Sequence, residues 1–142
     1  MRRPRCRWAL AILLAVASSG CVRDAPLPTE RLGGLPWRLV EFDLEAPAAD
    51  APAITLSVEP RRVSGSSGCN RYFGELTFGE RPGEIRMGTI GSTRRMCPEA
   101  EMERESRYLR ALGHVGSYAL VDGELRLFSR HDGQTIELTF AR

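Results

Sequence analysis

The chain has 142 residues, of which 42% are hydrophobic, and a formal net charge of +2 from 20 basic and 18 acidic residues. Every basic residue is arginine, and four arginines lie within the first seven positions, so the remainder is close to neutral. A near-neutral chain without a basic cluster is not expected to bind nucleic acid, and its length suits one small domain with a single core.

The first twenty residues have the pattern of an export signal. A positively charged start is followed by an apolar run from Trp8 to Val16 and by small side chains at positions 17–20. The apolar run is much shorter than the roughly 20 residues that a membrane-spanning helix needs. Residues 1–20 are therefore predicted to be a signal peptide.

Cys21 follows these small residues directly, as the acylated cysteine does in bacterial lipoproteins. Ser18 stands where that motif usually has leucine, so an ordinary secretory signal is the alternative. Each buried methylene of an acyl chain contributes about 0.8 kcal/mol, and several chains would anchor the protein stably. Because Val22 follows in place of aspartate, an outer membrane lipoprotein facing the periplasm is expected. Residues 21–35 are predicted to be the lipidated N-terminus and a flexible tether, and residues 36–142 the folded domain.

The first part of the domain has the patterns of several short strands. Residues 54–59 alternate apolar and polar side chains, as a half-buried strand does. The Ala/Pro-rich residues 46–53 are predicted to be a loop, and Gly74 indicates a bulge or a close approach of two backbones. The predicted strands are Trp37 to Leu44, Ile54 to Glu59, Arg62 to Gly65, Asn70 to Phe78, Glu84 to Met87 and Ile90 to Arg95.

One helix is predicted over about 98–113. Pro98 suits the first helical position, and Gly113 suits the end. On its outer side, Glu103 is expected to pair with Arg107. The residues expected on its inner face are Met102, Ser106, Leu109 and Leu112, with Tyr108 beside them.

Glu105 interrupts the charged outer side of this helix. It is expected near the rim of the barrel, facing an arginine such as Arg94.

The last third of the chain predicts a three-stranded meander. Asp122-Gly123 and Asp132-Gly133 are typical two-residue hairpin turns. These turns set Tyr118 opposite Leu127 and Leu127 opposite Leu138, and a shift of one residue would reverse the two faces. The residues expected in the core are Leu120, Leu125, Leu127, Leu138 and Phe140, and those expected on the outer face are Arg126, Arg130, Glu137 and Thr139. The fold class is thus mainly β (α+β), a small antiparallel barrel or strongly curved sheet of about eight strands with the one helix packed on it.

Two short motifs, GCNRYFG at residues 68–74 and TRRMC at residues 93–97, resemble the signatures of the META domain family of HslJ-like bacterial lipoproteins. The resemblance extends from about Leu35 to Phe140 and departs from the pattern at Arg95. It implies a small barrel, a link to heat shock or envelope stress, and tolerance of aminocoumarin drugs such as novobiocin. It implies no established reaction or ligand. The positions that carry it are Gly68, Cys69, Asn70, Arg71, Tyr72, Gly74, Thr93, Arg94 and Cys97.

Cys69 and Cys97 are the cysteines that remain in the domain once Cys6 leaves with the signal and Cys21 is acylated. An exported pair without a third partner predicts a disulfide. The alternative is a reactive Cys97 thiol, activated by the arginines and the helix N-terminus beside it.

Other polar residues predict no active site. His114 and His131 lack the clustered spacing of zinc ligands and are expected at the surface, so no metal is predicted. Asn70, Arg71 and Tyr72 either line a ligand or partner surface or have structural roles, with Asn70 bonding the backbone and Arg71 pairing with an acidic neighbour. We find no Ser-His-Asp order, phosphate loop or pair of catalytic carboxylates, so neither an enzyme nor a cofactor is predicted.

The predicted function is a non-enzymatic, lipid-anchored protein of the cell envelope. Its expected partners are the membrane, through the N-terminal lipid, and either an envelope protein or a small apolar ligand. One alternative is a lysozyme or hydrolase inhibitor that binds through a protruding Ser64–Gly68 loop. The other is a carrier with an apolar cavity lined by Tyr118, Leu127 and Leu138.

Overall fold

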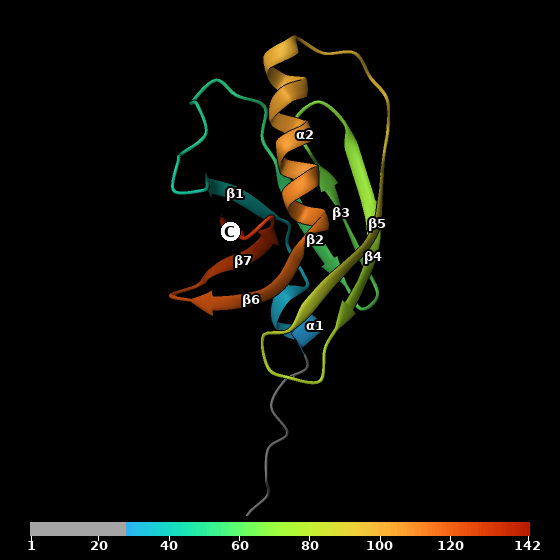
Figure 1. Ribbon diagram of the computed structural model, residues 1–142, viewed down its shortest axis with the longest axis vertical. Helices are drawn as coiled ribbons and strands as arrows, with labels where there is room; N and C mark the ends of the chain where they lie inside the picture. Colours follow the sequence, from blue (N-terminus) through green and yellow to red (C-terminus); the bar gives the residue numbers. More distant parts are fainter. Residues whose placement is uncertain (1–27) are drawn as a thin grey trace, which may run out of the picture.

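The computed structural model describes residues 28–142, so the predicted signal peptide and Cys21 lie outside the described residues (Figure 1). None of the described helices is long and apolar enough to cross a bilayer. In chain order the elements are α1 (Pro28–Leu32), β1 (Trp37–Phe42), β2 (Thr55–Glu59), β3 (Arg62–Ser66), β4 (Arg71–Phe78), β5 (Ile85–Ser92), α2 (Glu99–Gly113), β6 (Val115–Val121), β7 (Glu124–His131) and β8 (Gln134–Ala141).

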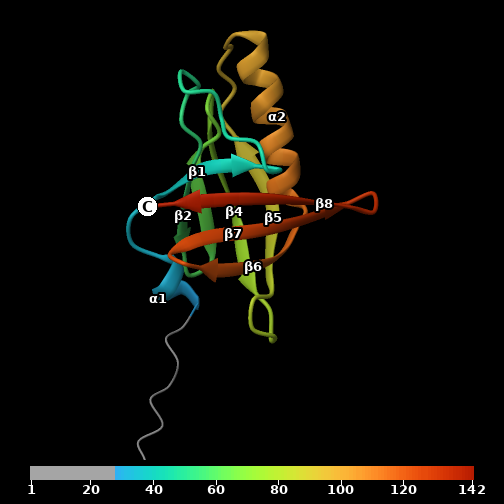
Figure 2. The same cartoon turned by 90° about the vertical axis from the view of Figure 1, so that its left-hand side faces the viewer.

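The eight strands form one antiparallel sheet in the order β5-β4-β3-β2-β1-β8-β7-β6. Strand β1 joins a meander of β2 to β5 to a second meander of β6 to β8, and Figure 2 shows the second group running across the first. The two edge strands meet at one end, where Glu84 and Ser117 form a bridge and the Tyr118 N–H donates to the Gly83 carbonyl at 2.8 Å. The sheet is thus a nearly closed barrel, which confirms the predicted fold class.

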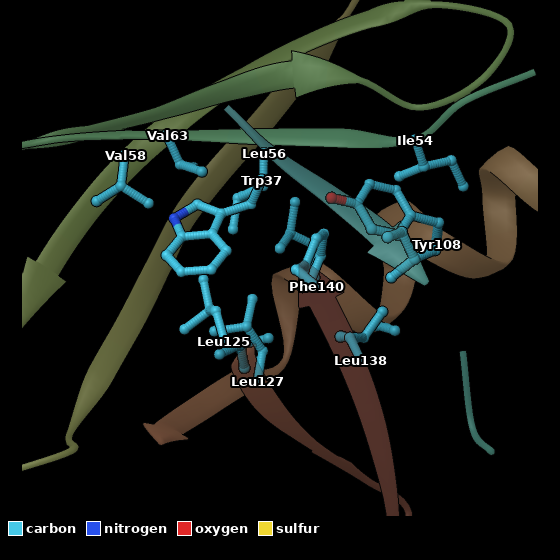
Figure 3. Close-up of a cluster of buried hydrophobic side chains, with 14 of the residues drawn as sticks. Trp37, Ile54, Leu56, Val58, Val63, Tyr108, Leu125, Leu127, Leu138 and Phe140 are labelled. Carbon is cyan, nitrogen blue, oxygen red and sulfur yellow. The ribbon is translucent and has the colours of Figure 1, made fainter. Parts of the chain in front are cut away.

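The core fills the space between the two crossed groups of strands (Figure 3). Side chains of β1, β2 and β3 face those of β7 and β8, and Tyr108 enters from α2, which covers the open side of the barrel. The fully buried apolar residues of this core include Leu56, Val63, Tyr108, Leu112, Leu125, Leu127, Leu138 and Phe140.

The register of the C-terminal meander is the predicted one. Tyr118 pairs with Leu127, Leu127 with Leu138 and Leu125 with Phe140. Thr139 alternates with the core residues Leu138 and Phe140, as predicted, but the outer face does not expose it, because it is only 3% exposed. In the sheet, Thr139 of β8 pairs with Glu41 of β1 on one side and with Arg126 of β7 on the other, and both neighbours have longer side chains.

Two strand boundaries differ from the prediction. Residues 85–92 form the single strand β5 in place of two separate strands, and a register shift opposite Gly74 and Leu76 absorbs the irregularity. Strand β1 ends at Phe42 because Asp43 and Leu44 adopt positive φ values of 52° and 67°, which turn the chain out of the sheet.

The buried face of α2 is rotated relative to the predicted one. Ser106 is exposed and Met102 and Leu109 are half-buried. The residues that α2 buries are Glu105, Tyr108, Ala111 and Leu112. Glu105 turns inward because hydrogen bonds from the β3–β4 turn meet its carboxylate, as described below.

The predicted pair of Glu103 and Arg107 does not form. The Arg107 guanidinium instead lies 5.1 Å from the centre of the Phe42 ring. A cation over an aromatic face is itself favourable, by about 0.5–1 kcal/mol at an exposed site.

The segment before β1 is packed against the barrel. Leu32, at the end of α1, is 1% exposed, and its carbonyl accepts hydrogen bonds from Trp37 Nε1 at 2.9 Å and from Arg142 at 2.7 Å. The Arg142 guanidinium also lies 3.9 Å from the centre of the Trp37 ring. Residues 28–35, which the sequence assigned to the tether, therefore include the short helix α1, and hydrogen bonds from Trp37 and from the C-terminal Arg142 hold the end of this helix.

Candidate functional site

Asn70 is the centre of a polar cluster between the two sequence motifs and α2. Its Oδ1 accepts hydrogen bonds from the Thr93 hydroxyl at 2.8 Å and from the Arg95 backbone N–H at 2.7 Å. Its Nδ2 donates to the Glu105 carboxylate at 2.8 Å, and its backbone N–H donates to the same carboxylate at 2.9 Å. One buried side chain thus ties the start of β4 to the segment after β5 and to the helix.

The Glu105 carboxylate accepts three hydrogen bonds in this cluster. They come from the Ser67 hydroxyl and from the backbone and side-chain amides of Asn70. Glu105 is 8% exposed, and a carboxylate can be held in such a place because these donors replace its hydration. We call Ser67, Asn70, Thr93 and Glu105 the polar cluster.

The predicted position of Glu105 opposite Arg94 is wrong. Arg94 is exposed and forms no ion pair with any residue of the described part of the chain. The inward position of Glu105 could have been predicted from its spacing to the apolar residues of the helix. It lies three residues before Tyr108 and seven before Leu112, and residues at this spacing share one face of a helix.

Cys69 and Cys97 form a disulfide, with their Cα atoms 6.0 Å apart. This separation is within the range of ordinary disulfides and agrees with the prediction. The bond joins the β3–β4 turn to the residue that precedes Pro98 at the start of α2. It leaves no free thiol at Cys97, so the structure does not favour the reactive-thiol alternative.

The two motif glycines have different physical roles. Gly68 has a φ of 99°, which favours glycine, and a Cβ there would lie 2.9 Å from the Arg104 Nη2. Gly74 lies at the irregularity between β4 and β5, where a Cβ would lie 3.3 Å from the backbone carbonyl oxygen of Thr89 and 3.2 Å from Ile90 Cγ1. Both alternatives raised for Gly74, a bulge and a close approach, therefore apply.

Tyr72 forms a buried pair with Tyr108 of α2. The Tyr72 hydroxyl donates to the Thr55 carbonyl at 2.8 Å and lies 2.8 Å from the Tyr108 hydroxyl, which donates to it. Burial raises the pKa of both phenols well above the usual value, and the neighbouring phenol raises the pKa of Tyr108 further. Both groups stay protonated at neutral pH and fasten α2 to β2 and β4.

The remaining motif residues lie at the surface. Arg71 is exposed, and the expected ion pair with an acidic neighbour is not formed within the described residues. Its backbone N–H donates to the Thr93 hydroxyl at 3.1 Å. The motifs thus consist mainly of residues that hold the β3–β4 turn, β5 and α2 together.

His114 and His131, whose spacing in the sequence did not place them together, lie side by side at the surface. Their ring centres are 4.1 Å apart, and His131 Nε2 lies 3.2 Å from the Asp132 carboxylate. Over residues 28–142, no three His, Cys, Asp or Glu side chains are grouped so that they could hold a metal ion.

Fold and site together define a small barrel-like β domain that is covered on one side by the helix α2. A disulfide joins the β3–β4 turn of this domain to the start of that helix. The chain belongs to the META domain family, whose family model matches residues 30–141.

The solved structures that are similar to the chain include the following three. An NMR structure of a protein from Burkholderia xenovorans is 27% identical, with a TM-score of 0.61 over 99% of this chain and 98% of that chain. A second NMR structure is 24% identical, with a TM-score of 0.62 over 82% and 95% of the two chains. The crystal structure of a DUF4847 family protein from Bacteroides vulgatus ATCC 8482 is 12% identical, with a TM-score of 0.56 over 80% and 95%, and shows the fold alone. None of the curated proteins compared with the chain matches it.

Proposed function

We propose that this META domain protein is held at the cell envelope by a lipid on Cys21 and acts by binding, in the response to envelope stress or in tolerance of aminocoumarin drugs. The observation that carries the proposal is the Cys69–Cys97 disulfide. Such bonds persist in oxidising compartments, and the export pattern of residues 1–20 supplies the route to one.

The uncharged polar side chains of the motifs are occupied by hydrogen bonds within the domain, which supports a binding role over a catalytic one. Asn70, Thr93 and Glu105 bond to one another, and burial keeps the Tyr72 phenol protonated. A general base needs a free acceptor within reach of substrate, but the Glu105 carboxylate and the Asn70 amide oxygen already accept hydrogen bonds within the cluster. The META family is not a known enzyme family.

The inhibitor alternative receives no support from the structure. A loop that enters an enzyme cleft must protrude, but Ser64 to Ser66 belong to β3. Ser67 is fully buried and donates to Glu105.

The carrier alternative is not supported at its predicted place. Leu127 and Leu138 are fully buried among core side chains. The cavity beside Tyr118 lies outside this core and is lined by charged residues such as Glu80, Arg81 and Glu84.

Metabolic labelling with a fatty-acid probe tests the anchoring. We expect the wild type to be labelled and the Cys21→Ala variant to be unlabelled, because only that thiol would be acylated. Cys6→Ala is the matched control, since Cys6 would leave with the signal, and it should label like the wild type. Equal labelling of Cys21→Ala would overturn the proposal on location.

A deletion strain tests the role in the cell. We expect altered sensitivity to aminocoumarins and other envelope-active drugs, restored by the wild-type gene and only partly by Cys21→Ala. Unchanged sensitivity across the panel would overturn the stress and tolerance proposal, without affecting the labelling result.

A further inference from the structure

A cavity of about 190 Å³ lies outside the barrel core, between α2 and the loop that joins β1 to β2. Its floor is apolar, because the buried Leu39 and Ile54 and the half-buried Phe42 line it. The loop contributes Glu45, Ala46, Pro47 and Ala48, and α2 contributes Arg104 and Arg107. The loop itself, residues 46–53, was predicted from the sequence, but nothing in the sequence placed it over the helix.

Arg104 has more hydrogen-bond donors than acceptors around it. A guanidinium has five N–H donors, and the bond it makes is from Nη2 to the Pro52 carbonyl at 2.9 Å. Its Nε is buried and has no acceptor among the described residues. No carboxylate of the described chain pairs with it. A partly desolvated cation without a counter-ion favours the arrival of an anion.

Arg107 also has no carboxylate partner and is available to bind an anion. Its contact is with the Phe42 ring, 5.1 Å away, and it forms no ion pair within residues 28–142. Both arginines lie on α2 three residues apart, so their side chains project to the same side of the helix. The cavity therefore presents two guanidinium groups above an apolar floor.

The charges around the cavity select for a single negative charge. Glu45 is the one acidic residue that lines it, against two arginines. A dianion such as a phosphate monoester would be repelled by Glu45, whereas one carboxylate leaves the lining neutral. The apolar floor then accommodates the hydrocarbon part of the same molecule.

The loop side of Arg104 offers additional room for the ligand. A second cavity of about 150 Å³ shares Arg104, Leu39 and Ile54 with the first and extends under residues 47–53. Both volumes are below the roughly 300–1,000 Å³ of sites for drug-sized ligands, so the ligand must be small.

We propose that this cavity binds a small amphipathic monocarboxylate, with its carboxylate on Arg104 and Arg107 and its hydrocarbon part on Leu39, Phe42 and Ile54. Gly68 of the first sequence motif contributes to the site, because a side chain there would occupy the space of the Arg104 guanidinium. The site goes beyond the proposed function and does not depend on acylation of Cys21.

Titration of the purified, 15N-labelled full chain with octanoate, followed by 1H–15N NMR spectra, tests this site. We expect shift changes concentrated in residues 39–54 and in α2 around Arg104 and Arg107. Octanol lacks the charge and should bind at least about tenfold more weakly than octanoate, which is the effect of losing one charge-assisted interaction. Acetate keeps the charge but lacks the hydrocarbon chain, and at about 0.8 kcal/mol for each buried methylene it should also bind at least about tenfold more weakly.

Variants of the two arginines separate charge recognition from folding. Arg107→Gln should weaken octanoate binding about tenfold or more, because it removes one charge-assisted interaction. The melting temperature should fall only slightly, because Arg107 is exposed, makes no hydrogen bond and loses only its contact with the Phe42 ring. Arg104→Gln should weaken it similarly, with its fold checked by the same spectra. Arg110→Gln, one turn along α2 and outside the cavity, should bind like the wild type.

Three results would overturn the inference. They are no octanoate-dependent shifts, shifts of equal affinity with octanol, and wild-type affinity in Arg107→Gln and Arg104→Gln. None of them would alter the expected fatty-acid labelling or drug sensitivity, so failure of this site is distinguishable from failure of the proposed function.

Discussion

At the scale of single residues, the polar cluster shows how one buried asparagine organises three separate segments. Asn70 uses both ends of its side-chain amide, one toward the segment after β5 and one toward Glu105 of α2. Because these hydrogen bonds are buried or partly buried, loss of the amide would leave donors and acceptors without partners.

We therefore expect Asn70→Ala to lower the free energy of unfolding by about 2–4 kcal/mol, since it removes a bond to a carboxylate and orphans its partners. Arg71→Ala is the matched control, because the neighbouring Arg71 is exposed and should change stability by less than about 0.5 kcal/mol. Chemical denaturation measures both. Equal losses in the two variants would mean that the cluster is not the reason for the effect.

The Tyr72–Tyr108 pair predicts a loss of stability at alkaline pH. Burial raises the pKa of both phenols in the folded state, whereas in the unfolded chain they titrate at about pH 10. The folded state then binds more protons than the unfolded chain above that pH. The contribution of this pair to the free energy of unfolding is therefore fully present below about pH 10 and is lost as the pH rises further.

Denaturation measured over a range of pH checks this. Tyr108→Phe, which removes one phenol and leaves the Tyr72 bond to Thr55 in place, should show a shallower alkaline decline than the wild type. A decline as steep as that of the wild type in both Tyr108→Phe and Tyr72→Phe would assign the alkaline transition to other groups.

At the scale of elements, the C-terminal meander of β6, β7 and β8 has the strand register that its two turn sequences predict. Its two Asp-Gly turns adopt positive φ at both positions, with φ of 51° and 85° at the first and 49° and 77° at the second. These turns determine the register of β6, β7 and β8, and the register sends alternate residues into the core.

Leu127→Ala should cost about 2–5 kcal/mol of stability, because Leu127 is fully buried between Tyr118 and Leu138 and its truncation leaves a cavity. Arg126→Ala, the next residue on the opposite face, should cost less than about 1 kcal/mol, since its ion pairs with Glu124 and Glu137 are partly exposed. Thermal or chemical unfolding distinguishes the two, and similar losses would contradict the register.

At the scale of the whole molecule, two long-range connections hold the peripheral segments against the barrel. The Cys69–Cys97 disulfide links the β3–β4 turn to the start of α2 across 28 positions. At the other end, Arg142 binds the carbonyl of Leu32 and so joins the C-terminus to α1. The helix and the N-terminal segment, which have few backbone bonds to the sheet, are held by these links.

Removal of the disulfide should lower stability clearly without removing the fold. For a loop of this length the chain-entropy treatment gives about 3–4 kcal/mol, an upper figure because strain and residual denatured structure reduce it. The melting temperature of the paired variant Cys69→Ser and Cys97→Ser, compared with the wild type with and without reductant, checks this. A reductant-sensitive melting temperature in the paired variant would indicate another cause.

The sequence by itself determined the features that depend on neighbours along the chain. Alternation of apolar residues and the chemistry of Asp-Gly turns specify the meander, because each strand meets the next across two residues. The cysteine pair was also readable, since few partners were available. Tertiary structure decided the rest. Glu105 meets Asn70 across 35 positions, and Arg104 and Arg107 meet the β1–β2 loop only after α2 has packed against the barrel. Contacts between segments so far apart depend on the closed sheet that brings them together, and no local pattern of residues encodes them.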